Sequence, residues 1–253
     1  TGWIDPEASV TLEYLHGGDT VMVAQQYSYL TSWLSLLIEP SYGAEAAHAL
    51  FRKVYGHWTT LPKDDRPELY LYGLSLGALS SEQSTEIYNI LADPFQGALW
   101  AGPPFNSRLW SNFTRDRNPG TPAWLPRLGD GSVVRFTAQK NSLDIPGAKW
   151  GPLRIVYLQY ASDPVVFFDP LAWYRRPAWL VGERGPDVSP DLRWYPIVTF
   201  LQLALDMAMA TTAPIGYGHL YAPQHYIDAW VAVTQPEGWS PAEIERLKEK
   251  LKK

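Results

Sequence analysis

The sequence feature that most constrains the fold is a glycine–serine pattern directly after a short apolar run. Residues 68–80 read Glu-Leu-Tyr-Leu-Tyr-Gly-Leu-Ser-Leu-Gly-Ala-Leu-Ser, so that Ser75 lies between Gly73 and Gly77. The tyrosines and leucines before Ser75 favour a strand, and apolar residues recur at helical spacing after Gly77. This order is typical of a sharp strand-to-helix turn that presents a nucleophilic serine, and bulky side chains at the two glycines would clash across such a turn. The alternative is an ordinary glycine connection between a strand and a helix.

The composition limits the class of protein. The chain has 253 residues, 46% of them hydrophobic and 19% charged, which suits one large domain or two small ones with a sizeable core. Its net charge of −5 argues against a nucleic-acid binder, which would carry a basic stripe. The absence of cysteine excludes disulfides and thiolate chemistry. No apolar run reaches membrane-spanning length, and the best candidate, Tyr195–Ala210, predicts a packed helix because it contains Gln202 and Asp206.

Strand-like and helix-like segments alternate along the chain. We expect strands over residues 19–26, 68–74, 97–102, 133–137 and 153–160. We expect helices over 6–15 (capped by Asp5), in a stretch broken at Glu39-Pro40, over 44–55, after Gly77, and over 196–210 and 224–233. This alternation predicts an α/β fold with a doubly wound, mostly parallel sheet and helices on both faces. Functional residues then collect at the carboxyl ends of the strands.

Two regions depart from this alternation. Residues 103–130 are rich in Pro, Gly, Asn, Arg and Trp and predict an irregular excursion from a catalytic domain that spans residues 1–238. Residues 239–253 predict an amphipathic terminal helix with a capping box formed by Ser240 and Glu243. This helix is expected to be docked or fraying rather than a partner-binding device.

A nucleophilic serine needs a general base, usually histidine, and a carboxylate that orients the base. Only His219 and His225 follow Ser75, as the chain order of strand-to-helix serine enzymes requires. His219 is favoured because it lies in a glycine-flanked loop before a helix, although a loop histidine bonded to backbone would look the same. His225 opens a helix, where a cap or surface contact would explain it.

Asp163 is the preferred acid because it follows the strand over 153–160 at the carboxyl end. Asp169 is the runner-up, and Asp206 lies within a helix and is expected to be structural. The alternative for Asp163, which precedes a proline, is a simple turn initiator.

Two further histidine patterns are set aside. His16-Gly17-Gly18 looks like the oxyanion motif of lipases, but it follows a helix rather than a strand, and helix C-capping explains it. No His-Glu-x-x-His is present, and His48 and His57 have no obvious partner spacing. A metal enzyme is therefore disfavoured, and no cofactor is expected.

Segments spread over nearly the whole chain carry a family resemblance: residues 1–6, 13–19, 26–37, 73–77, 97–104, 157–166, 184–190 and 218–219. In these the chain resembles a bacterial family of alpha/beta-hydrolase catalytic domains found behind a membrane-embedded N-terminal region. The resemblance implies a triad of Ser75, Asp163 and His219. It also implies a strand before Thr1, which is absent here, so that the chain is expected to begin within the oxyanion loop. Because the first residue is Thr rather than Met, we expect a fragment or processed chain.

The resemblance bears on localisation and preference as well. It implies a chain that is soluble by itself and membrane-associated within a full-length protein. The resemblance implies a polar or acidic residue in place of Leu74, a small polar residue in place of Ala78 and a polar residue in place of Leu220. These departures flank the nucleophile and the base and therefore concern substrate preference.

Together these features predict a serine hydrolase that cleaves small-molecule or lipid carboxylic esters. The backbone N–H of Leu76 and a second N–H at Gly2 or Trp3 would hold the oxyanion. Candidate residues of an apolar pocket are Leu74, Phe105, Trp110, Trp124 and Leu220, with a plain surface loop as the alternative for 103–130. Two other functions stay open: an acyltransferase or thioesterase with the same triad, and a catalytically silent ligand-binding domain.

Overall fold

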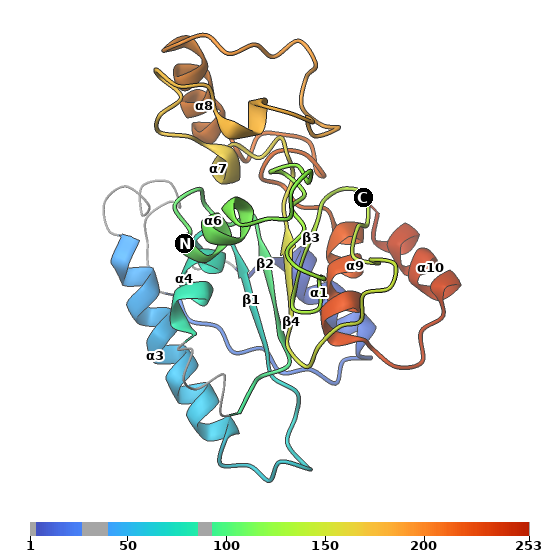
Figure 1. Cartoon of the computed structure of the whole chain (residues 1–253). Coiled ribbons are helices and arrows are strands. Elements are labelled where there is room, and N and C mark those ends of the chain that lie inside the picture. The colour runs from blue at the N-terminus through green and yellow to red at the C-terminus, as the bar shows by residue number, and fades with distance from the viewer. Residues whose placement is uncertain (1–3, 27–39, 86–92, 253) are drawn as a thin grey trace.

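A four-stranded sheet forms the centre of the computed structural model, which describes residues 4–26, 40–85 and 93–252 (Figure 1). Its strands are β1 (Tyr70–Leu74), β2 (Gly97–Ala101), β3 (Val134–Thr137) and β4 (Arg154–Leu158). The sheet order is β1-β2-β4-β3, and every pair is parallel. The expected parallel α/β fold is confirmed. The carboxyl ends of all four strands align, because Leu74 pairs with Ala101, and Leu158 with both Ala101 and Thr137.

Helices cover both faces of the sheet. One face carries α1 (Pro6–Leu15), α9 (Pro223–Thr234) and α10 (Pro241–Leu251), and the other carries α3 (Pro40–Trp58) and α4 (Leu76–Ser84). Side chains alternate between the faces, as the strand pleat requires: Leu99 and Ala101 contact the first layer, whereas Ala98 and Trp100 contact the second. The fully buried pattern of β2 agrees with a strand covered on both sides.

The helix ends follow the capping chemistry of the sequence. Asp5 accepts a hydrogen bond from the N–H of Glu7 at the start of α1, and Ser240 and Glu243 form the reciprocal capping box of α10. Leu247 is buried and Lys248 lies 2.6 Å from Asp228 of α9, so the terminal helix is docked.

Two sequence expectations need correction, and two others fall outside the described residues. The strand over 19–26 is wrong: these residues form no strand, and Val21 is 91% exposed, so no sheet partner covers its apolar side chains. The region 103–130 is not wholly irregular, since α6 (Arg108–Arg115) begins where Ser107 accepts a hydrogen bond from the N–H of Trp110. The end of the helix before Pro40, and residues 86–91 after α4, lie outside the described residues.

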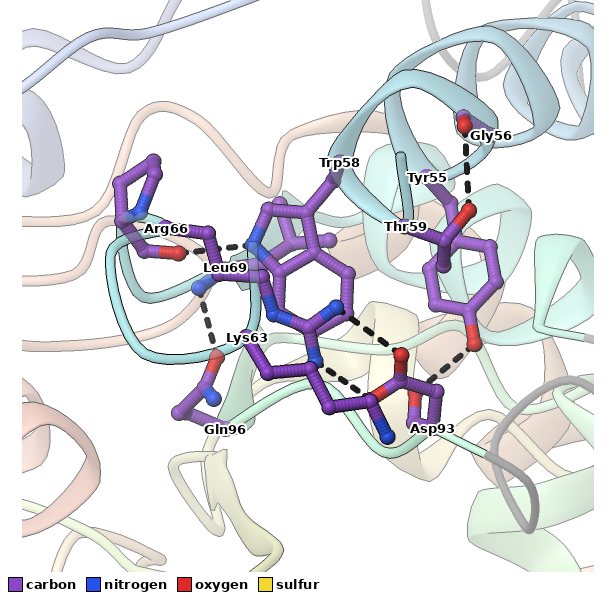
Figure 2. A network of polar contacts seen from close by, with 10 residues as sticks. Tyr55, Gly56, Trp58, Thr59, Lys63, Arg66, Leu69, Asp93 and Gln96 are labelled. Atoms are coloured by element: carbon purple, nitrogen blue, oxygen red, sulfur yellow. Dashed lines mark hydrogen bonds and ion pairs between the residues drawn. The ribbon is translucent and has the colours of Figure 1, made fainter. Parts of the chain in front are cut away.

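A polar cluster joins the end of α3 to the segments that lead into β1 and β2 (Figure 2). The guanidinium of Arg66 stacks 3.5 Å from the ring of Trp58 and binds the carboxylate of Asp93 through two nitrogens. Tyr55 donates to the carbonyl of Asp93 at 2.7 Å, and the amide of Gln96 accepts the N–H of Leu69 at 2.7 Å. These contacts lie at the amino ends of the strands, away from Ser75, and hold β1 beside β2.

The segment between α7 (Pro164–Phe167) and α9 lies over the carboxyl ends of the strands, with α8 (Val198–Ala208) at its outer side (Figure 1). Besides α8, it holds a short 3-10 turn, Ala178–Leu180, and its remaining residues form loops. We refer to residues 169–217 as the cap segment.

Candidate active site

Ser75 lies at the turn between β1 and α4, directly after the carboxyl end of the strand. Its backbone has φ 57° and ψ −122°, a conformation that L-residues rarely adopt and that costs of order 1–3 kcal/mol. The N–H of Ser75 donates to the carbonyl of Ala101 at the end of β2, at 2.9 Å. This hydrogen bond holds the strained turn against the neighbouring strand and leaves the partly exposed Ser75 side chain at the sheet edge.

The two flanking glycines are not equivalent. A Cβ atom at Gly73 would lie 2.3 Å from the carbonyl carbon and oxygen of Gly77 and 2.4 Å from the nitrogen of Ala78, so only glycine fits where the helix returns over the strand. At Gly77 an added Cβ meets no atom within 4 Å. A larger residue would therefore clash, as expected, at Gly73, whereas a Cβ added at Gly77 would not.

Asp163 is fully buried and follows the end of β4 by five residues. One carboxylate oxygen, Oδ1, accepts the N–H of Val165 at 2.8 Å. The other, Oδ2, lies 2.7 Å from Nδ1 of His219 and accepts the hydroxyl of Tyr221 at 2.6 Å. Three donors therefore compensate a carboxylate that would be costly to bury alone.

His219 points its two ring nitrogens into different surroundings. Nδ1 faces the carboxylate of Asp163, which can only accept a hydrogen bond when ionised, so Nδ1 carries the proton. Nε2 is then the acceptor nitrogen, and it is buried with no hydrogen-bond partner among the described residues. A buried basic nitrogen without a partner is available to take a proton from a group that approaches it.

Ser75 and His219 each approach the turn that follows β2. A Cβ atom built on Gly102 would lie 2.8 Å from Cε1 of His219, and the preceding residue, Ala101, accepts the N–H of Ser75. Gly102 has φ 51°, so both the conformation and the proximity of the imidazole favour glycine there. The structure shows no hydrogen bond between Ser75 and His219, since Nε2 has no partner; in unliganded sites such bonds are often long.

The comparisons with known proteins bear on this arrangement. A family model described as "Alpha/beta-hydrolase family" matches residues 1–247. The chain belongs to this alpha/beta-hydrolase family. No curated protein and no solved structure matches the chain. The expected family is thus confirmed, while the family description specifies neither a substrate nor the residues that react.

The residues expected to bind an oxyanion are only partly described. Leu76 is the first residue of α4, so its N–H has no acceptor within the helix and lies next to the Ser75 side chain. Gly2 and Trp3 lie outside the described residues. Close to the start of the described chain, the carboxylate of Asp5 accepts hydrogen bonds from the hydroxyls of Tyr72 in β1 and Tyr226 in α9, at 2.8 and 2.6 Å.

The expected pocket residues occupy different environments. Leu74 and Leu220 are partly buried neighbours of Ser75 and His219 in sequence. Phe105 packs edge-to-face on Phe168, with ring centroids 5.1 Å apart. Trp110, by contrast, is a core residue: its indole N–H donates to the amide of Gln159 at 2.6 Å, and it is only 7% exposed.

The alternative acid and base residues have structural contacts of their own. Nδ1 of His225 lies 2.5 Å from the hydroxyl of Tyr160. Asp169 accepts the N–H of Leu171 in a local turn, at 2.8 Å. Asp206 is an exposed residue within α8. His16 ends α1 and lies 3.0 Å from the hydroxyl of Thr234.

Two features of the site escape a reading of the sequence. Tyr221, two residues beyond His219, donates a hydrogen bond to Asp163. It is the last residue of the Tyr-Gly-His-Leu-Tyr pattern, but a tyrosine by itself does not indicate a role in the site. Asp187 lies within the family segment 184–190 and binds the residue before Asp163. Only the folded chain brings positions 163, 187 and 219 together.

The rest of the described chain offers few further candidate sites. Within residues 4–26, 40–85 and 93–252, no three His, Asp or Glu side chains are grouped so as to hold a metal ion. No helix in the same ranges is both long and apolar enough to cross a bilayer. A polar surface hollow of about 630 Å³ is lined by residues that include His16, Glu68 and Arg154. It lies at the amino ends of the strands, opposite Ser75.

Proposed function

We propose that this chain is a serine hydrolase of carboxylic esters. The proposal is carried by the His219–Asp163 pair, in which Nε2 of His219 has no partner among the described residues, together with a strained serine on a strand-to-helix turn. The same constellation of a serine, a histidine and an orienting carboxylate defines acyl-transfer enzymes by geometry. Family membership supports hydrolysis as the reaction class.

In the proposed reaction, the Oγ of Ser75 attacks the ester carbonyl carbon while Nε2 of His219 takes the hydroxyl proton. Asp163 keeps Nδ1 protonated and stabilises the imidazolium that forms. The tetrahedral oxyanion accepts the N–H of Leu76 at the start of α4. Collapse expels the alkoxide, which takes the proton from His219 and leaves as an alcohol. Water, deprotonated by the same nitrogen, then releases the carboxylic acid and restores Ser75.

An apolar acyl group fits the surroundings of the serine. Leu74 and Leu220 flank Ser75 and His219, and Phe105, Phe168 and Phe200 form a chain of ring contacts from the carboxyl end of the sheet to α8. The outer face of α8 is also apolar, with Val198, Leu201, Leu205 and Met209 each 55–65% exposed. Exposed apolar patches of this kind mark sites of interaction. We therefore propose esters with a medium or long acyl chain as the substrate class.

Labelling with a fluorophosphonate tests the reaction class. The wild-type chain should be labelled at Ser75, and Ser75→Ala should abolish labelling without loss of fold, measured by circular dichroism. Ser142→Ala, which alters a partly exposed serine, is the matched control and should label normally. A folded wild-type chain that resists labelling would contradict the proposal and favour the silent ligand-binding domain.

A series of nitrophenyl esters from acetyl to decanoyl tests the substrate class. We expect kcat/KM to rise with chain length as apolar surface is buried, and a preference for acetyl would contradict the apolar pocket. Adding an alcohol acceptor or a thioester substrate to the same assay measures acyl transfer and thioester cleavage. Hydrolysis should dominate both.

A further inference from the structure

Asp187 links three segments that meet at the carboxyl ends of the strands. Its Oδ2 accepts three hydrogen bonds: from the N–H of Ser162 at 3.0 Å, from the hydroxyl of Ser162 at 2.6 Å, and from the amide of Gln139 at 2.7 Å. Ser162 directly precedes Asp163, and Gln139 follows the end of β3 by two residues. Asp187 itself belongs to the cap segment. It therefore ties the cap segment to the loop that carries the proposed acid.

The same contacts continue to the loop that carries the proposed base. The hydroxyl of Ser162 accepts the N–H of Gly218 at 3.0 Å, and the amide of Gln139 donates to the carbonyl of Gly216 at 3.3 Å. Gly218 directly precedes His219. Ser162 and Gln139, the two direct partners of Asp187, therefore both bind the backbone segment that precedes His219.

The direction of these hydrogen bonds depends on the carboxylate. A serine hydroxyl has one proton and two lone pairs. Because that proton points to Asp187, the lone pairs of Ser162 are free to accept the N–H of Gly218. The acceptor carboxylate likewise orients the two amide protons of Gln139, one toward Asp187 and one toward Gly216. Loss of the carboxylate would free both groups to rotate away from the base loop.

The backbone around Asp187 is fitted to this position. A Cβ atom at Gly185 would lie 2.0 Å from the Cβ of Ala161, so only glycine lets this turn approach the acid loop so closely. The N–H of Val188 closes the turn on the carbonyl of Gly185 at 3.1 Å. Ser162, Gln139 and Asp187 are each partly buried, so competition from water is reduced.

We propose that Asp187 is a positioning residue, through which the cap segment fixes the acid loop and the base loop relative to each other. The proposal rests on the proposed serine hydrolase function and deepens it. Asp187 acts through Ser162 and Gln139 and touches no reacting atom. Its effect is therefore on the orientation of His219 toward Ser75, with the binding of substrate left largely unchanged.

Kinetics of Asp187→Ala and Ser162→Ala on a nitrophenyl ester test the role. We expect kcat to fall about 10- to 100-fold in Asp187→Ala, as for a small misplacement of a catalytic group, with KM changed far less. Ser162→Ala keeps its N–H for Asp187 but cuts the bond to Gly218, so it should lower kcat in the same direction. Asp187→Asn keeps an acceptor oxygen and should recover part of the loss. Asp191→Ala, an exposed aspartate of the same segment, is the matched control and should retain the wild-type kcat.

A second measurement does not depend on activity. The Nδ1 proton of His219, held by Asp163, should give a low-field proton NMR signal that is absent in His219→Gln. We expect the signal to weaken or shift in Asp187→Ala and Ser162→Ala and to persist in Asp191→Ala. If the wild type neither labels nor hydrolyses esters, the proposed function fails, and the NMR signal still decides the positioning role. Wild-type kcat and an unchanged signal in folded Asp187→Ala or Ser162→Ala would overturn it.

Discussion

His219 and His225 lie on opposite sides of a stacked tyrosine pair, Tyr160 and Tyr221, whose ring centroids are 4.4 Å apart. Both imidazoles are almost fully buried. His219 faces a carboxylate, and its second nitrogen has no partner in the described part of the chain. His225 faces the hydroxyl of Tyr160 instead. Burial, with a smaller contribution from the charge of Lys248, lowers the pKa of His225 to about 4.

The difference shows what makes a buried histidine useful for proton transfer. An imidazole with a carboxylate on one side can hold a positive charge, because the carboxylate compensates it. An imidazole with only a hydroxyl partner cannot, and its pKa falls. His219 and His225 are only six residues apart in sequence, and the residues after β4 give them different partners. Tyr160, the partner of His225, lies just after the carboxyl end of β4, and Asp163, the partner of His219, lies three residues later.

The largest expected effect comes from exchanging the two histidines for glutamine. His219→Gln should lower kcat about 10⁴-fold or more, because the proposed base is lost. His225→Gln should keep the wild-type rate, since this imidazole has no contact with Asp163. Ester hydrolysis by both variants, measured on samples of equal fold, checks the pair. Equal losses would contradict the assignment of His219 as the base.

Asp163→Asn addresses the carboxylate that distinguishes His219 from His225. The amide is similar in size but donates a proton toward Nδ1, so His219 is pushed into the wrong tautomer. We expect kcat to fall about 10³- to 10⁴-fold. Asp169→Asn, at the runner-up position, should leave the rate unchanged. A comparable loss at Asp169 would show that the acid is misassigned.

The stability of the protein should fall in acid because of His225. Its folded pKa, about 4, lies below the ordinary value of about 6.5, so the unfolded chain binds the proton more readily. The stability due to neutral His225 is therefore complete above pH 6.5 and is lost as the pH falls through 4. At about 1.4 kcal/mol for each pKa unit, the lowered pKa of His225 corresponds to a loss of roughly 3 kcal/mol in the free energy of unfolding in acid. Denaturant unfolding between pH 4 and 7 should show this loss in wild type and not in His225→Gln.

A variant of Glu82, which lies on the other face of the sheet, distinguishes the effect of His225 on stability from a general sensitivity to pH. Glu82 lies in α4, contacts the hydroxyls of Ser107 and Tyr157, and burial raises its pKa to about 7. Its contribution to stability is complete below the ordinary pKa of 4.5 and is lost as the pH rises through 7. Glu82→Gln should therefore raise stability at pH 8 and leave the acid loss due to His225 in place. Unfolding curves of Glu82→Gln at pH 5 and 8 test this sign.

Local patterns in the sequence predict much of the fold, because each depends on neighbouring residues. Asp5 and Ser240 cap their helices, and the run before Ser75 forms a strand. The failure at 19–26 has a physical reason: β-rich composition forms a strand only where a sheet edge accepts it. Trp110 was expected at a pocket, but the hydrogen bond to Gln159 and core packing hold it inside.

The residues of the candidate site also divide into those that the sequence predicts and those that it does not. Positions at strand ends, such as Ser75 and Asp163, follow from chain order and topology. The partners that orient them come from distant segments: Tyr221 reaches Asp163 across 58 residues, and Asp187 reaches Ser162 across 25. No spacing rule connects these residues, since only the packing of the loops on the sheet edge brings them together.

The smallest effect, and the sharpest test of the comparison, comes from the two stacked tyrosines. Tyr221→Phe removes one of three donors to Asp163 and keeps the ring stack. Burial, and next the charge of Asp163, raise the pKa of Tyr221 well above its ordinary value, so the hydroxyl stays protonated and donates. A hydrogen bond to a charged group contributes about 1.5–3 kcal/mol. Because two donors to Asp163 remain, we expect the lower end of this range, a loss in kcat of about tenfold, read from ester hydrolysis.

Tyr160→Phe is the matched change on the other side of the stack. Its hydroxyl accepts the N–H of Ala222 and contacts Nδ1 of His225, so its loss should lower stability and alter the acid unfolding profile, while kcat stays at the wild-type value. Opposite outcomes for the two Phe variants would mean that the stacked rings separate a catalytic imidazole from a structural one. A similar fall in kcat for both would mean that the two imidazoles belong to one coupled network, because Tyr221→Phe removes a donor to Asp163 whereas Tyr160→Phe removes only the contacts to His225 and Ala222.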